Sequence, residues 1–162
     1  MKDLKEYIKE GLFDDLEEIE KIGGMESNIK LLKKEIKKWI KENYDCTRLE
    51  ISDKPNENGL YEVNARNATV KNKNTISLTN GMFEWKEIQA SFNCSGCYKL
   101  ESLRGAPKKV GNDFICVHCK SLKTLEGAPK EVGGDFHYYY CKTVFTTNDV
   151  IKVSDVKGKI YC

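Results

Sequence analysis

Two closely spaced pairs of cysteines are the residues of this sequence best suited to metal chemistry. Cys94 and Cys97 form one Cys-x-x-Cys pair, and Cys116 and Cys119 form the next, with residues 98–115 between the pairs. Four thiolates at this spacing are typical of a structural zinc site. Buried cysteines also pack as small apolar side chains. The pattern therefore leaves two interpretations, zinc ligands or uncharged thiols in a core.

The spacing of the four cysteines follows from an internal repeat of 22 residues. Residues 92–113 and 114–135 match at the phenylalanine that opens each copy, at both cysteines, at two leucines and at a Gly-Ala-Pro triplet. A third copy over 136–157 places Tyr138 where the other copies have their first cysteine. A position that accepts tyrosine does not require a thiolate. We therefore expect buried free thiols with no cofactor, and we keep zinc bound by the four cysteines as the alternative.

A repeat of this length predicts a solenoid of stacked coils. Phe-x-Cys has a period of two, so both side chains leave a strand on the same side. One coil buries about six apolar side chains at ~1.5–3 kcal/mol each. That is less than the ordering cost of ~1.5 kcal/mol per residue, so coils must stack and their strands must form a parallel sheet. The pattern extends in both directions to about five coils. Toward the N-terminus, Val70 is in register with Phe92 and Ile88 with Val110, and toward the C-terminus Ile160–Cys162 resembles a further strand.

This pattern resembles the leucine-rich-repeat superfamily, and most closely its cysteine-bearing members. The Phe-x-Cys-x-x-Cys-x-x-Leu-x-x-Leu runs over 92–103 and 114–125 stand where that superfamily has its strand, its asparagine or cysteine ladder and its returning leucines. The repeats are also similar to those of short, mostly uncharacterised proteins from bacteriophages and mobile elements of gut bacteria. The resemblance implies a viral protein that works as a repeat-built binding module.

The N-terminal part of the chain is predicted to form a helical hairpin. Apolar residues recur every three or four positions over residues 4–19 and again over 29–40. Gly23–Gly24 separates the two stretches, and Ser27 is a candidate cap for the second helix. Two amphipathic helices with a short joint are expected to pack antiparallel and to cover one end of the solenoid.

The expected fold class is therefore α+β, with a helical hairpin over 1–46 capping a short leucine-rich-repeat-like parallel β-solenoid over 47–162. Met1–Glu10 also resembles the short N-terminal segment that directs internal proteins of bacteriophages into the forming head. That resemblance implies a targeting role for the hairpin, whereas the stacking argument needs only a cap.

The composition excludes several classes of protein. The chain has 27 Lys and Arg against 25 Asp and Glu, so its net charge of +2 gives little attraction for nucleic acid or anionic lipid. No apolar stretch is long enough to span a bilayer. The N-terminus lacks an apolar signal core, and the seven cysteines are an odd number. We expect reduced thiols and a cytoplasmic location, which is the host cytoplasm for a bacteriophage protein, or a place in the virion.

No catalytic constellation is evident, so the chain is not expected to be an enzyme. His118 and Cys119 are adjacent, but neighbouring residues of a coil point in different directions, whereas a nucleophile and its base need hydrogen-bond reach. The Gly-Ala-Pro and Val-Gly segments are turns and lack the pattern of a phosphate-binding loop. The scattered carboxylates are expected at this charge content.

The outward strand positions form the candidate partner-binding surface. Those positions, with two close neighbours, are Asn93, Ser95, Ile115, Val117, His118, His137, Tyr139 and Tyr140. Tyrosine is enriched in protein-binding hot spots, and Ile115 with Val117 predicts an exposed apolar patch. The competing expectation is that the hairpin or residues 145–162 cover this patch.

The expected function is non-enzymatic protein–protein interaction. One version is a bacteriophage protein that binds and blocks a host factor, including a defence component, and the other is a protein associated with the virion or its head. A zinc-stabilised nucleic-acid-binding module is the alternative from a different class, and it requires both bound metal and salt-dependent binding.

Overall fold

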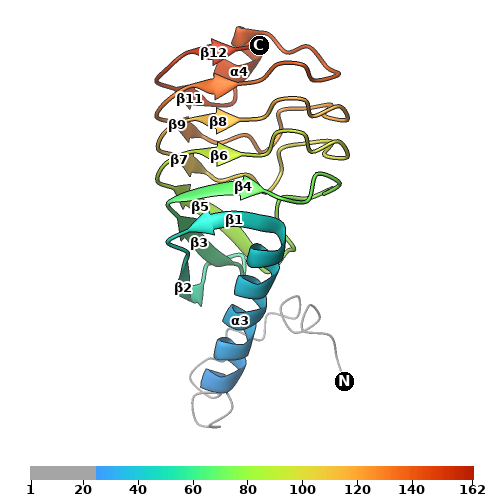
Figure 1. Ribbon diagram of the computed structural model, residues 1–162. Helices are drawn as coiled ribbons and strands as arrows, with labels where there is room; N and C mark the ends of the chain where they lie inside the picture. The colour runs from blue at the N-terminus through green and yellow to red at the C-terminus, as the bar shows by residue number, and fades with distance from the viewer. Residues whose placement is uncertain (1–24) are drawn as a thin grey trace.

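The repeats fold into stacked coils that each contribute one short strand to each of two sheets. The computed structural model describes residues 25–162 and shows a β-solenoid of about five coils preceded by a helix (Figure 1). The phenylalanine that opens each copy and the valine before each glycine corner are buried, while their strand neighbours are half-buried or exposed. These two inward positions hold the sheets against each other.

The two sheets run the length of the solenoid. Sheet A contains, in spatial order, β1 (Tyr44–Thr47), β4 (Asn67–Val70), β6 (Phe92–Asn93), β8 (Phe114–Ile115), β10 (Phe136–His137) and β12 (Ile160–Tyr161). Sheet B contains β11 (Asp155–Val156), β9 (Glu131–Val132), β7 (Lys109–Val110), β5 (Phe83–Ile88), β3 (Tyr61–Ala65) and β2 (Glu50–Pro55). Strands within the repeats are parallel, whereas the pairs β1–β4 and β2–β3 at the N-terminal end are antiparallel.

Sheet B corrects the expectation of a single parallel sheet. Strands β7 and β9 are only two residues long. Each consists of one exposed residue and one fully buried valine, Val110 or Val132, and a glycine follows the valine. Strands this short leave no alternating pattern in a sequence. The likeness to leucine-rich repeats therefore holds at the level of a solenoid built from a 22-residue repeat.

Helix α3 (Met25–Asn43) covers the N-terminal end of the core (Figure 1). Leu32, Ile36 and Ile40 are buried in the core at successive helical turns, as the spacing of apolar residues predicts. The Trp39 ring lies 5.7 Å from that of Phe83 in an edge-to-face contact. No helix among the described residues is long and apolar enough to cross a bilayer.

Among residues 25–162 the structure shows one long helix and one short helix, and these do not form a helical hairpin. The expected first helix, over residues 4–19, lies outside the described residues, as does the segment similar to a head-targeting sequence. The expected second helix is confirmed as α3, but it begins at Met25, so Ser27 lies within the helix and is not its cap. Within residues 25–162 the cap is therefore provided by α3.

A short helix that the sequence interpretation missed closes the last coil. Helix α4 (Thr147–Ile151) begins with a capping box, in which the Thr146 hydroxyl accepts from the Asp149 backbone N–H and the Asp149 carboxylate accepts from that of Thr146. Val150 is fully buried in the core cluster. The Thr-x-x-Asp pattern is a sequence signal for such a helix start.

Aromatic rings stack through the core from coil to coil. The rings of Phe92 and Phe114 lie 5.7 Å apart and nearly parallel, and those of Phe114 and Phe136 lie 4.9 Å apart. The register changes at both ends of the stack. Phe136 pairs with Ile160, so the last coil has two more residues than the repeat. Phe92 pairs with Ala68 and not with Val70, the residue that the 22-residue spacing predicts.

Glycine at the corners allows the coils to stack closely. A Cβ atom on Gly133 would lie 2.1 Å from the carbonyl oxygen of Gly111, which is the equivalent residue of the preceding coil. At Gly127 a Cβ atom would lie 2.5 Å from Cα and N of Arg104, and the φ angle of +84° also favours glycine. Backbone atoms cannot rotate away as side chains do, so contacts this short exclude a methyl group.

Replacing Gly127 by alanine is expected to lower the free energy of unfolding by about 2–5 kcal/mol, from the left-handed backbone and the overpacked corner together. Gly81 is the matched control because its φ is +80° but a Cβ atom there would meet nothing within 4 Å. Gly81→Ala should therefore lose only about 1–2 kcal/mol. Equilibrium urea unfolding measures both values, and equal losses would contradict close stacking at the Gly127 corner.

Candidate functional site

The outer face of sheet A presents the side chains that alternate with the core residues. The core residues of these strands point inward and are fully buried; they are Phe92, Cys94, Phe114, Cys116 and Phe136. Asn93, Ser95 and Ile115 are half-buried on the outer face. Val117 is buried with 7% of its surface exposed, which corrects the expected exposed apolar patch. Of the four residues, Asn93 and Ser95 are polar, and Ile115 is the apolar one that stays partly exposed.

The predicted aromatic residues gather toward the C-terminal end of the outer face. We define the aromatic face as His118, His137, Tyr139, Tyr140 and Tyr161. The rings of His118 and Tyr140 stack with their centroids 4.9 Å apart, and those of His137 and Tyr161 stack at 4.8 Å. Tyr139 links the two pairs through edge-to-face contacts with Tyr140 at 5.1 Å and His137 at 6.3 Å. The five rings thus form one continuous chain of contacts across neighbouring coils.

Much of the aromatic face is accessible to a partner. Tyr140 is 66% exposed, Tyr161 is 40% exposed and Tyr139 is 37% exposed. A hollow in this surface is lined by His137, Tyr139, Tyr140, Thr147, Ile160, Tyr161 and Cys162. Residues 145–162 therefore extend the surface through β12 and contribute to the wall of the hollow, rather than covering the rings.

Sequence reasoning missed Tyr161 as a member of this face. Tyr161 pairs with His137 across β10 and β12, but it is 24 residues further along the chain because of the two-residue insertion. The signal was present in the predicted strand at Ile160–Cys162, where a residue next to an inward isoleucine must point outward. A register that allows for the insertion places Tyr161 in the same row as His137.

Two residues of the aromatic face have left-handed backbone conformations. His118 has a φ of 58° and Tyr140 a φ of 57°, and the equivalent residue of the preceding coil is Gly96, with a φ of 71°. This conformation costs a non-glycine residue roughly 1–2 kcal/mol. The turn therefore favours glycine, and the two later coils carry large ring side chains at the same place.

The buried cysteines form a ladder of thiols between coils. Cys94, Cys97, Cys116 and Cys119 are fully buried, Cys46 and Cys141 are half-buried, and Cys162 is exposed. The Cys119 thiol donates to the carbonyl oxygen of Cys94 at 3.3 Å, and the Cys141 thiol makes the equivalent bond to the carbonyl oxygen of Cys116 at 3.3 Å. These bonds require protonated sulfurs at Cys119 and Cys141.

The same network shapes the acidity of the buried thiols. Hydrogen bonds from Cys116 and Cys119 lower the pKa of Cys94 to about 6, and hydrogen bonds with Cys119, Cys141 and Cys94 raise the pKa of Cys116. Burial raises the pKa of Cys97 to about 12. A four-cysteine zinc site needs its four sulfurs around one point, and within residues 25–162 these four sulfurs do not come together as a group of metal ligands. The thiol geometry thus supports a packed ladder over the zinc alternative.

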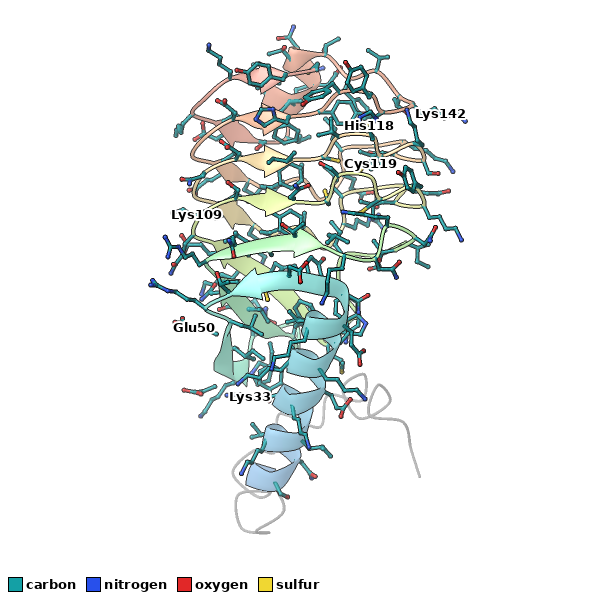
Figure 2. All side chains as sticks on the ribbon, viewed as in Figure 1. Lys33, Glu50, Lys109, His118, Cys119 and Lys142 are labelled. Atoms are coloured by element: carbon teal, nitrogen blue, oxygen red, sulfur yellow. The ribbon has the colours of Figure 1, made fainter. Side chains whose placement is uncertain are left out.

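The adjacent residues His118 and Cys119 are not arranged as a catalytic pair. The Cys119 side chain is fully buried in the thiol ladder, whereas His118 is exposed and stacks on Tyr140 at the turn that follows β8 (Figure 2). Their side chains therefore lie on opposite sides of the coil, as the alternation of the sequence predicts. The geometry offers no activated nucleophile at this turn.

No family model, curated protein or solved structure matches this chain. The arrangement of the described residues is therefore the basis for inferring a function.

Alkylation of the native protein with iodoacetamide should separate the cysteines by burial. Cys162 is exposed and should react first, while the four fully buried thiols should react only after unfolding, because a thiolate must be both formed and reachable. Mass spectrometry of peptides before and after addition of denaturant measures this order. Rapid modification of Cys94 or Cys116 in the native protein would contradict the buried ladder.

Proposed function

We propose that this protein binds another protein through the aromatic face. The observation that carries the proposal is the continuous chain of five ring contacts, with Tyr139, Tyr140 and Tyr161 substantially exposed beside one hollow. Aromatic side chains with few rotatable bonds supply large contact area at low entropic cost. Rings that already hold each other in place lose little further freedom when a partner covers them.

The left-handed residues support a role for the rings beyond folding. Gly96 shows which residue this turn favours, because glycine adopts a positive φ without steric cost. His118 and Tyr140 occupy equivalent turns at a cost of roughly 1–2 kcal/mol each. Backbone strain of this kind concentrates at binding and catalytic sites. We interpret both side chains as retained for the surface they create.

The charges beside the aromatic face suggest the chemistry of the partner. The Lys120 ammonium group donates to the Tyr140 carbonyl oxygen at 3.1 Å, and within residues 25–162 it forms no ion pair. A partner segment with an apolar or aromatic side chain for the hollow and an acidic residue opposite Lys120 fits this surface. In the setting implied by the resemblance to bacteriophage proteins, that partner is a host factor or a virion component, and the function involves no catalysis.

Removing the two strained rings should weaken partner binding without unfolding the protein. The partner is first captured from a lysate of the source cells through a photo-crosslinking amino acid at Tyr139, then purified and titrated. We expect the double variant His118→Gly/Tyr140→Gly to bind at least ~10-fold more weakly, as for loss of hot-spot residues. Tyr98→Ala is the control, because Tyr98 is 52% exposed but lies outside the aromatic face.

The control variant should bind as tightly as the wild-type protein. Equal affinity of the wild-type protein and the double variant, each shown to be folded by its urea transition, would overturn the proposal. Crosslinking to nucleic acid alone, with affinity that falls steeply as salt is raised, would instead favour the nucleic-acid alternative.

A further inference from the structure

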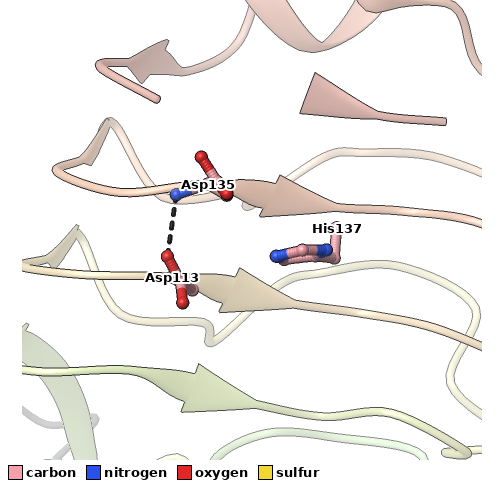
Figure 3. A group of neighbouring side chains, drawn as sticks. All are labelled: Asp113, Asp135 and His137. Carbon is pink, nitrogen blue, oxygen red and sulfur yellow. Dashed lines mark hydrogen bonds between the residues drawn. The ribbon is translucent and has the colours of Figure 1, made fainter. Parts of the chain in front are cut away.

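Three side chains with metal-ligating atoms meet at the start of strand β10. They are Asp113, Asp135 and His137, which are all half-buried, and their ligand atoms all lie within 4.8 Å of one another (Figure 3). Asp113 comes from the corner before β8, and the other two come from the next coil. Within residues 25–162, no other three Asp, Glu, His or Cys side chains bring their ligand atoms this close together.

Both carboxylates are held in place by the backbone of the following coil. Asp113 Oδ1 accepts from the Asp135 N–H at 2.9 Å, and Asp135 Oδ1 accepts from the Lys159 N–H at 2.7 Å. A Cβ atom on Gly134 would lie 2.3 Å from Asp113 Oδ1, and one on Gly158 equally close to Asp135 Oδ1. The two glycines thus leave the space that the carboxylates occupy, and each carboxylate keeps its second oxygen free for another ligand.

The hydrogen bonds between coils do not explain why these residues are charged. At the equivalent corner of the preceding coil the Ser91 hydroxyl accepts from the Asp113 N–H at 3.3 Å, so a neutral side chain also completes this contact. In the described part of the chain neither aspartate has an ion-pair partner. Two half-buried carboxylates that lie this close together make a region of negative charge in which a cation would be stabilised.

The third ligand is oriented by its aromatic neighbours. The His137 ring stacks on Tyr161 with an interplanar angle of 6° and meets Tyr139 edge to face, so its position beside the carboxylates is fixed by packing. Ligands held by surrounding side chains bind a metal with less loss of freedom.

We infer that Asp113, Asp135 and His137 bind one divalent transition-metal ion, of which zinc is the best match. An imidazole with two carboxylates suits zinc and its neighbours in the first transition row, whereas magnesium and calcium favour sites made only of oxygen ligands. Ligand atoms around a tetrahedral zinc lie roughly 3.4 Å apart for bonds of ~2.1 Å. Small side-chain rotations bring the three groups to that spacing, and water completes the coordination. The site is separate from the four buried cysteines. It shares His137 with the aromatic face, but metal binding requires no protein partner.

Cobalt(II) is the probe for this site because its visible absorption reports its ligands. We expect the reduced full-length protein to bind one equivalent of Co²⁺, to release it to Zn²⁺, and to show no thiolate charge-transfer band. Asp113→Asn and Asp135→Asn keep an oxygen that accepts the backbone hydrogen bond while losing the charge, and His137→Ala removes the imidazole. Each variant should bind Co²⁺ at least ~10-fold more weakly.

Two variants serve as matched controls. His118→Ala removes the other histidine of the chain, and Cys162→Ser removes the exposed thiol that lines the hollow beside His137. Both should keep the wild-type affinity for Co²⁺. Thermal melting without metal shows whether each ligand variant is folded, and Zn²⁺ should raise the melting temperature of the wild-type protein and of both controls but not of the three ligand variants. The inference is overturned if the wild-type protein binds no Co²⁺, if the folded ligand variants bind it unchanged, or if a thiolate band shows that cysteines hold it.

Discussion

Successive coils of this solenoid touch through their backbones at the glycine corners, and no side chain fits between them there. Gly133 rests against Gly111 and Gly127 against Arg104, each from the preceding coil. This contact fixes the distance and the register from one coil to the next. The stacked phenylalanine rings and the paired strands require that register because they join equivalent residues of neighbouring coils. The thiol ladder requires it because each of its bonds runs from a cysteine of one coil to a carbonyl oxygen of the coil before.

A fixed register turns a sequence repeat into columns of side chains on the surface. In each column the structural task is the same, but the residue type changes along the stack. One column runs from Gly96 through His118 to Tyr140, and another from Ser91 through Asp113 to Asp135. The residue in the first column adopts a positive φ, and the side chain in the second accepts a backbone N–H of the next coil. Gly96 and Ser91 meet these requirements in the coil nearest the N-terminus, and aromatic or charged residues meet them in the two coils that follow. The surface chemistry therefore gathers at the C-terminal end of sheet A.

Features that depend on long or repeated patterns could be predicted from the sequence. The 22-residue coil and the amphipathic helix α3 are confirmed. Sheet B escaped prediction because β7 and β9 contribute two residues each, too few for a visible period. Tyr161 was missed because an insertion shifts it by two positions, and the group of Asp113, Asp135 and His137 because only the stacked coils bring it together.

Deleting one whole coil is the most direct test of the register between coils. Removal of residues 114–135 joins Asp113 to Phe136, just as Asp135 precedes Phe136 in the intact chain. Removal of residues 114–124 deletes half a coil and places core residues at surface positions. We predict that the whole-coil deletion unfolds in urea with one cooperative transition and that the half-coil deletion shows none. Loss of the transition in the whole-coil deletion, or equal stability of the two, would contradict the account.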